Sequence, residues 1–204
     1  MDLSVDEVVS LEKGRARITL DNGMQFILYR GEMRQLSIKQ GTRISQEQYE
    51  YILQDIIGKR VKKRALYLLQ KQDRTEKQLY DKLKQSEYPE ECIENAIQYV
   101  KDYHYIDDER FAKSYIRYHQ EKKSLKRLEM DLLSKGVDKI TIEDALDEEF
   151  DADEKQMIAK LLEKKKFDAS HADVAVRRKL YQFLLRRGFK SNDILTVMEH
   201  YNPS

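Results

Sequence analysis

Three consecutive carboxylates, Asp107-Asp108-Glu109, have side chains of the type that could hold a metal ion for phosphoryl transfer. Consecutive side chains fan around the first turn of a helix, and no histidine or further carboxylate stands beside these three at ligand spacing. Asp107 is instead a suitable helix N-cap, and Asp108 and Glu109 suit the positive first turn that follows. We therefore expect this segment to begin a helix rather than to bind a metal ion.

The remaining reactive residue types are dispersed along the chain. Neither the HExxH nor the H-x3-H spacing of a metal site occurs among the histidines, which are His104, His119, His171 and His200. Gly23, Gly31 and Gly41 lie too far apart for a phosphate-binding loop, and Gly-x-Ser-x-Gly is missing. The single cysteine, Cys92, allows no internal disulfide and is interpreted as a structural helix residue in a reducing cytoplasm. The sequence predicts no catalytic residues and no cofactor, and it favours a binding protein over an enzyme.

Basic residues recur in short runs that could bind nucleic-acid phosphates or an acidic protein surface. Segments 59–84, 111–139 and 157–190 are basic, whereas segments 85–110 and 140–156 are acidic. Solvated helix faces are commonly charged, but an alternation in register with a repeat lets the basic segments combine into one stripe. The candidate contact residues are Lys62, Lys63, Arg64, Lys122, Lys123, Lys126, Arg127, Arg177, Arg178, Lys179, Arg186 and Arg187.

The chain also contains 13 tyrosines, whose rings could stack on nucleic-acid bases. Tyr99 and Tyr103, like Tyr115 and Tyr118, lie at helical spacings of three or four residues. We expect these rings mainly to pack between helices. Tyr105, beside the expected helix start, is the candidate for an exposed ring.

The elements that would position these residues repeat along the chain. Thr75-Glu-Lys-Gln-Leu79-x3-Leu83 matches Ser124-Leu-Lys-Arg-Leu128-x3-Leu132 at an offset of 49 residues (124 − 75), and a third copy lies near the C-terminus. The matching positions are mostly apolar, so the repeated feature is a buried surface. Repeats of this kind stack on their neighbours, and the resulting elongated surface suits a polymer better than a small molecule.

Composition predicts a mainly helical fold. Seven Gly and two Pro leave little material for β-turns, and the stretch between Pro89 and Pro203 has no helix breaker. The charged fraction of 37% exceeds the typical value of roughly 25%. The first residues lack a secretory signal, and no apolar run is long enough to span a bilayer. We therefore expect a cytoplasmic protein with no membrane partner.

The first 45 or so residues predict a β-structure instead. Arg15–Asp21 and Met24–Tyr29 alternate polar and apolar side chains, and Asn22-Gly23 between them predicts a hairpin whose two turn residues accept a positive φ. A two-stranded hairpin is not stable alone. It therefore gains a further strand, from Val5–Leu11 or from Gln35–Lys39, or packs on the helices.

We expect a small β-hairpin-containing N-terminal domain followed by tandem three-helix bundles in an elongated, curved array. The predicted parts are a β-rich extension (1–44), a linker helix with the first three-helix repeat (45–106), a second repeat (107–154) and a third repeat (155–204). Ser45 is the expected N-cap of the linker helix. In the second repeat, helices are expected at about 107–122, 124–135 and 141–149.

Glycines mark where the second helix of a repeat ends. Gly136 and Gly188 occupy equivalent positions just past that helix, where a left-handed residue is common, but Glu87 takes this place in the first repeat and suggests a different turn. Pro89 then opens the third helix of the first repeat. About five residues are inserted near Phe167–His171, which predicts a longer loop in the third repeat.

The tandem modules and two motifs resemble the RecX family, bacterial modulators of the RecA recombinase. The motifs are Ile106-Asp-Asp-Glu-Arg-Phe-Ala112 and S-x3-L-x3-L-x2-K-G-V from Ser124 to Val137, and the resemblance extends over about Arg60 to Tyr201. It does not cover the β-rich extension. The residues of the first motif, read as structural, are Ile106, Asp107, Asp108, Glu109, Arg110, Phe111 and Ala112.

The resemblance implies a non-enzymatic, monomeric regulator without a cofactor. RecX-like proteins lie in the groove of the RecA filament on single-stranded DNA and limit its growth, ATP hydrolysis, strand exchange and co-protease activity, and several also bind DNA directly. Three alternatives remain open from the residues alone. They are a sequence-independent DNA- or RNA-binding helical repeat protein, a helical scaffold, and a nuclease that uses Asp107-Asp108-Glu109.

Overall fold

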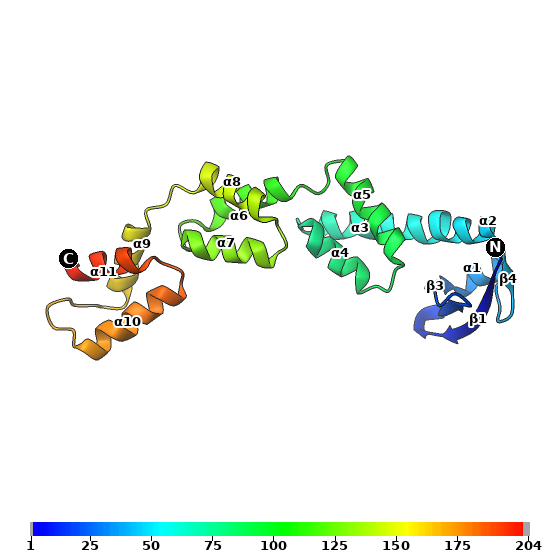
Figure 1. Ribbon diagram of the computed structural model, residues 1–204, viewed down its shortest axis with the longest axis horizontal. Coiled ribbons are helices and arrows are strands. Elements are labelled where there is room, and N and C mark those ends of the chain that lie inside the picture. The colour runs from blue at the N-terminus through cyan, green and yellow to red at the C-terminus, as the bar shows by residue number, and fades with distance from the viewer. Residues whose placement is uncertain (1, 202–204) are drawn as a thin grey trace. The chain divides into compact units, whose positions relative to one another are not determined.

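The computed structural model describes residues 2–201, and it confirms a mainly helical chain with an antiparallel sheet at its N-terminal end (Figure 1). The chain forms two compact units, of which the first ends at Asp107 and the second begins at Asp108. Each unit is described separately below. Within residues 2–201, no helix is both long and apolar enough to cross a membrane.

The sheet of the first unit has the strand order β3-β2-β1-β4. Its strands are β1 (Leu3–Ser10), β2 (Arg15–Leu20), β3 (Gln25–Tyr29) and β4 (Arg43–Ile44), with a short helix η1 (Glu12–Gly14) between β1 and β2. The predicted hairpin is confirmed as the β2–β3 pair. Only Gly23 has a positive φ in its turn (+81°), so the expected two-residue turn is wrong, and residues 21–24 connect the strands instead.

The hairpin gains two further strands. β1 pairs with β2 from Val5↔Leu20 to Ser10↔Ala16, which confirms the first of the two expected partners. The other expected partner, Gln35–Lys39, is wrong. This segment begins at the last residue of helix α1 (Arg30–Gln35) and forms no strand. β4 completes the sheet through the pairing Leu3↔Ile44.

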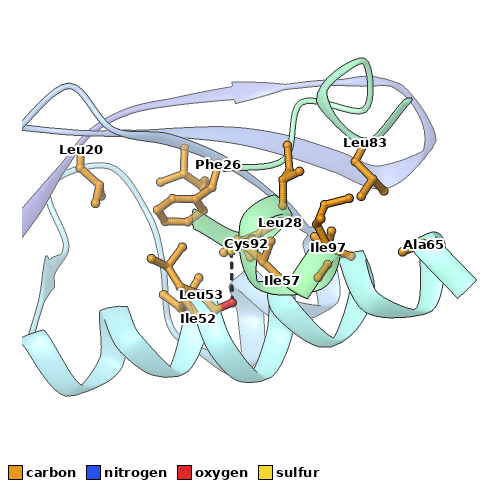
Figure 2. Close-up of a cluster of buried hydrophobic side chains, with 14 of the residues drawn as sticks. Leu20, Phe26, Leu28, Ile52, Leu53, Ile57, Ala65, Leu83, Cys92 and Ile97 are labelled. Atoms are coloured by element: carbon orange, nitrogen blue, oxygen red, sulfur yellow. Dashed lines mark hydrogen bonds between the residues drawn. The ribbon is translucent and has the colours of Figure 1, made fainter. Parts of the chain in front are cut away.

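One face of the sheet packs on a long helix to form the core of the first unit. Leu20, Phe26 and Leu28 point from the strands towards Ile52 and Leu53 (Figure 2), and all five side chains are buried. The helix is continuous through α2 (Gln46–Tyr51), the π-helix η2 (Ile52–Gly58) and α3 (Lys59–Lys71). Ser45 begins it as predicted, since its Oγ accepts a hydrogen bond from the Gln48 amide at 3.2 Å.

The first three-helix module is α3, α4 (Glu76–Lys84) and α5 (Glu90–Asp102). Thr75 and Gln78 form a capping box at the start of α4, and Pro89 stands at the N-cap of α5. Glu87 has a positive φ of +58°, as do Gly136 (+88°) and Gly188 (+89°) at the equivalent positions. The first module therefore keeps the left-handed residue of the other two, although its side chain is not glycine.

The π-helix η2 depends on a close approach between two backbone groups. A Cβ atom on Gly58 would lie 2.9 Å from the carbonyl oxygen of Leu53. The same oxygen accepts a hydrogen bond from the Cys92 thiol at 3.4 Å (Figure 2). Burial raises the pKa of Cys92 to about 11, so the thiol stays protonated and can donate this bond. Gly58 and Cys92 thus both lie close to one carbonyl group.

The second unit contains two further modules, each with its own core. One is α6 (Asp108–His119), α7 (Leu125–Ser134) and α8 (Lys139–Glu149), and the other is α9 (Glu154–Lys164), α10 (Val174–Arg186) and α11 (Ser191–His200). The first core includes Ile116, Leu128 and Ile142, and the second includes Ile158 and Leu184. The predicted long loop of the third repeat is confirmed between α9 and α10.

We predict that Gly58→Ala lowers the free energy of unfolding by up to about 2 kcal/mol. Forcing a methyl group against the Leu53 carbonyl costs about 1–3 kcal/mol, and the helix propensity of alanine returns up to about 1 kcal/mol. Denaturant unfolding measures the change. The control is Gly31→Ala in α1, where a Cβ meets no atom within 4 Å and stability should be unchanged or higher. Equal effects of the two substitutions would contradict the steric account.

Candidate functional site

Five cationic side chains from two modules of the second unit surround one hollow. Its volume is about 320 Å³. The residues that line it, here called the basic hollow, are Lys122, Lys123, Ser124, Arg127, Arg186, Arg187 and Phe189. All five cations are among the candidates identified from the sequence, where they lie in two runs about 60 residues apart.

A buried serine joins the two runs. Ser124 is 1% exposed, and its Oγ accepts a hydrogen bond from the Arg127 amide at 3.2 Å as the N-cap of α7. The same hydroxyl donates to the carbonyl oxygen of Arg187 at 2.7 Å, at the C-terminal end of α10. One side chain therefore both begins α7 and holds the end of α10 against it.

Two further contacts reinforce this junction. The Leu125 amide, in the first turn of α7, donates to Oε1 of Glu154 in α9 at 3.0 Å. Burial raises the pKa of Glu154, and the bond from Leu125 only partly offsets that effect. Gly188 lies close to the other side of the junction. A Cβ atom on it would lie 2.7 Å from Ser124 Oγ and 3.2 Å from the Arg127 amide nitrogen.

The basic hollow is strongly positive. Asp131 pairs with Lys123 at 2.8 Å and with Arg127 at 3.1 Å. Within residues 2–201, no carboxylate pairs with Lys122, Arg186 or Arg187. One carboxylate therefore faces five cations.

Two pKa shifts reflect the charges beside the hollow. Burial lowers the pKa of His119, and the nearby charge of Lys123 lowers it further. Burial raises the pKa of Asp131, but hydrogen bonds from Lys123 and Tyr115 outweigh burial, so this pKa is lowered overall. The histidine is thus held neutral and the aspartate ionised, as expected beside concentrated positive charge.

The chemistry of the basic hollow suits an anion such as a phosphate group. Lysine and arginine provide several hydrogen-bond donors that match phosphate oxygens, and arginine can bind in a bidentate manner. The lining contains no acid, thiol or imidazole. Its one hydroxyl, that of Ser124, is already engaged in the two hydrogen bonds described above. The hollow can therefore bind, but it has no group that would perform catalysis.

The other candidate cations lie elsewhere. Lys126 is next to the hollow and pairs with Glu129 at 2.8 Å. Arg177 is half-buried and donates to the carbonyl oxygens of Ala169 and Ala172, so it holds the long loop before α10. Arg178 lines an apolar groove between α10 and α11, and Lys179 is exposed. In the first unit, the Lys62 ammonium lies 5.0 Å from the centre of the Tyr99 ring, and Lys63 and Arg64 are exposed.

The Ile106–Ala112 motif makes structural contacts. Ile106 and Ala112 are 6% and 0% exposed. Lys113 bonds to Glu109 and to Glu148 of α8, both at 2.6 Å, and these bonds raise its pKa. Among the residues the structure describes, no group of three or more His, Cys, Asp or Glu is placed to hold a metal ion.

Ser124 and Phe189 are the lining residues that were not predicted. The N-cap role of Ser124 has a local signal, namely a serine directly before a helical pattern. The hydrogen bond from Ser124 to Arg187 has no local sequence signal, because 63 residues separate the two partners.

The tyrosines divide between packing and exposure. Tyr99 and Tyr115 are half-buried, whereas Tyr103 and Tyr118 are 61% and 74% exposed, so the expectation of packing is wrong for these two. Tyr105 is 50% exposed, as anticipated for a residue beside a helix start.

Comparison with known proteins places the three modules in one family. Residues 62–99, 107–146 and 152–198 match the models for the first, second and third three-helix domains of RecX. The "Regulatory protein RecX" of Caldanaerobacter subterraneus subsp. tengcongensis is 37% identical over 161 residues, which are 78% of this chain and 79% of that protein. The protein of the same name from Clostridium acetobutylicum is 26% identical over 95% of this chain and 92% of its own length.

Two solved structures have similar folds. A crystal structure of regulatory protein RecX superposes with a TM-score of 0.64 at 25% identity, and it covers 97% of this chain and 100% of that chain. The crystal structure of RecX from Lactobacillus salivarius gives a TM-score of 0.61 at 30% identity, over 70% of this chain and 95% of that one.

We predict that Gly188→Ala destabilises the second unit more than Gly41→Ala destabilises the first. Both glycines have a positive φ, +89° and +78°, so both substitutions carry a backbone penalty of about 1–2 kcal/mol. Only at position 188 would the added Cβ also press on Ser124 and the Arg127 amide. Denaturant unfolding of the two variants gives the comparison. Equal losses would show that α7 and the Gly188 turn are not in close contact.

We predict a pH-dependent effect of Glu154→Gln. Because the folded-state pKa of Glu154 is raised, ionisation of this carboxyl costs stability as the pH rises above its ordinary value of 4.5. Glutamine keeps the oxygen that accepts from Leu125 and cannot ionise. The melting temperature of Glu154→Gln minus that of the wild type should therefore increase from pH 4 to pH 7. Glu154→Ala, which loses the acceptor, is the control and should be less stable at both values. A difference that shrinks with rising pH would refute this account.

Proposed function

The chain belongs to the RecX family of regulatory proteins, and from this premise we propose that it is a non-enzymatic modulator, mainly an inhibitor, of the RecA recombinase. It binds the RecA filament on single-stranded DNA and limits filament growth, ATP hydrolysis, strand exchange and co-protease activity. It acts as a monomer in the cytoplasm and uses no cofactor.

The observation that carries this proposal is the basic hollow. Five cations facing one carboxylate can bind the phosphates of the DNA within the filament, or an acidic surface of RecA. Lys122, Arg186 and Arg187 are exposed, so they remain accessible to a large partner. Long-range attraction by such a cluster raises the association rate at low salt.

Acidic helices in the first and second modules complement the hollow in charge. Glu143, Asp144 and Asp147 are exposed on α8, and α5 has exposed glutamates in its first turns. Carboxylates repel DNA phosphates, so these surfaces remain off the nucleic acid or contact basic patches of RecA. This division of charge gives a bound regulator a defined orientation.

A second candidate function is sequence-independent binding of DNA or RNA without a protein target. The same hollow favours it, because phosphate contacts carry no sequence information and require no recombinase. The two functions differ in their partner. The first requires RecA, and the second requires nucleic acid only.

The test is the rate of ATP hydrolysis by RecA on single-stranded DNA while this protein is added below one copy per RecA protomer. We expect the rate to fall. In the variant Lys122→Ala/Arg186→Ala, the concentration needed for half-inhibition should rise between about twofold and thirtyfold. This range follows because two exposed ion pairs contribute about 0.2–1 kcal/mol each.

The matched control is Lys160→Ala/Lys164→Ala, which removes two exposed cations from α9 outside the hollow. It should inhibit like the wild type. Equal weakening of both variants would assign the effect to net charge and remove the hollow from the interface. No inhibition by the wild type, together with salt-sensitive binding to DNA alone, would replace the first function with the second.

A further inference from the structure

One face of α3 carries a stripe of cations around an exposed ring. Arg60, Arg64, Tyr67 and Lys71 recur at spacings of four, three and four residues, so they share one side of the helix. Arg64 Cζ and Lys71 Nζ lie 5.4 and 5.7 Å from the centre of the Tyr67 ring, which belongs to a residue 49% exposed. Lys62, which contacts Tyr99, lies on the opposite side of α3.

The free edge of the sheet extends this stripe. Arg60 donates to the carbonyl oxygen of Ile27 on the edge strand β3 at 3.0 Å, and it also pairs with Glu32. Its Cζ atom lies 4.7 Å from the centre of the Tyr29 ring, and Tyr29 is 43% exposed. In the β2–β3 register, Arg15 lies directly opposite Tyr29, so the two side chains are on the same face of the sheet.

Tyr88, in the loop between α4 and α5, connects the sheet and the helix. Burial raises its pKa, whereas the nearby positive charges of Arg60, Arg64 and Arg15 lower it. The charges of three guanidinium groups from two elements therefore act on one half-buried tyrosine. We call the set Arg15, Tyr29, Arg60, Arg64, Tyr67, Lys71 and Tyr88 the Arg–Tyr surface.

The charge of this surface is only partly neutralised. Glu32 pairs with Arg60, and the neighbouring Arg17 pairs with Glu87 at 2.7 Å. Over the described part of the chain, no carboxylate pairs with Arg15, Arg64 or Lys71. Cations free to bind an anion thus alternate with two exposed rings along a single face of the first unit.

We propose that the Arg–Tyr surface binds single-stranded nucleic acid, with bases stacked on Tyr29 and Tyr67 and phosphates on Arg15, Arg64 and Lys71. Proteins that bind single strands without sequence preference combine a basic track with aromatic side chains in this way, and arginines over the rings add cation–π attraction. An acidic protein segment would use the cations but has no use for two exposed rings. The β-rich extension thereby acquires a function, since it supplies Tyr29 and Arg15. This inference goes beyond the proposed function because it assigns single-strand binding to a surface of the first unit that is separate from the basic hollow.

The test measures binding of the full chain to two labelled probes by fluorescence anisotropy. One probe is oligo-dT about 12 nucleotides long, within the ~4–16-nucleotide range of small single-strand sites, and the other is an abasic oligomer with the same number of phosphates. Tyr29→Leu/Tyr67→Leu should weaken oligo-dT binding by at least about thirtyfold, the lower bound expected for the loss of two stacked bases, and leave abasic binding unchanged. Tyr29→Trp/Tyr67→Trp, which keeps a stacking face, should bind oligo-dT like the wild type.

The matched control is Tyr103→Leu/Tyr105→Leu, which removes two exposed rings that stack on each other in the same unit, 6.2 Å apart. It should bind both probes like the wild type. The tyrosine substitutions are also made in a protein that carries Lys122→Ala/Arg186→Ala, which weakens the basic hollow. The loss of oligo-dT binding caused by the tyrosine substitutions should persist in that background. An unchanged affinity for oligo-dT in Tyr29→Leu/Tyr67→Leu would overturn the proposal, as would an equal loss for both probes. Binding of an acidic peptide that depends on Arg64 and Lys71, without binding of oligo-dT, would assign the surface to a protein partner instead.

Discussion

The candidate site depends on the two hydrogen bonds made by the Ser124 hydroxyl. The hydroxyl accepts a hydrogen bond from the Arg127 amide and donates one to the Arg187 carbonyl. It therefore acts as both donor and acceptor although the side chain is buried. The two backbone groups that it joins belong to segments rich in like charge, which would otherwise repel each other. A neutral, buried hydrogen bond is well suited to this task, because salt screens it far less than an exposed ion pair. The cations are thereby left available for a partner.

Each of the three modules has a short polar N-cap residue at the start of its second helix. Thr75 and Ser124 occupy equivalent positions at the start of the second helix in their modules, and both are almost fully buried. Asp173 takes this position in the third module and bonds to the Val176 amide. A helix start must satisfy amides that have no partner within the helix, so a short polar side chain is required there. At Ser124, the same side chain that caps the helix also contacts the neighbouring module.

Local signals in the sequence were sufficient to predict most of the elements. Ser45 caps a helix as expected, and Asn22-Gly23 lies in the turn between two strands. The strand pairing Leu3↔Ile44 was not predictable because it joins segments far apart in the sequence. The π-helix was not predictable because it involves a close approach of Gly58 to the Leu53 carbonyl. The candidate site shows the same limit. The run Lys62-Lys63-Arg64 suggested one patch, but successive helix residues face different sides, and Lys62 contacts Tyr99 whereas Arg64 contacts Tyr67. Lys122 and Arg186 converge because long-range contacts, among them the bond from Ser124 to Arg187, hold α7 and the end of α10 together.

The two modules of the second unit have separate apolar cores, and hydrogen bonds connect them. Ser124 donates to the Arg187 carbonyl just past α10, the Leu125 amide donates to Glu154 at the start of α9, and Gln120 accepts from the Asp151 amide just before α9. Separating the modules would therefore break a few polar contacts and leave both cores intact. Openings of this kind require much less free energy than global unfolding. The junction is consequently the part of the unit that opens most easily, and the spacing of the cations around the hollow would change whenever it opens.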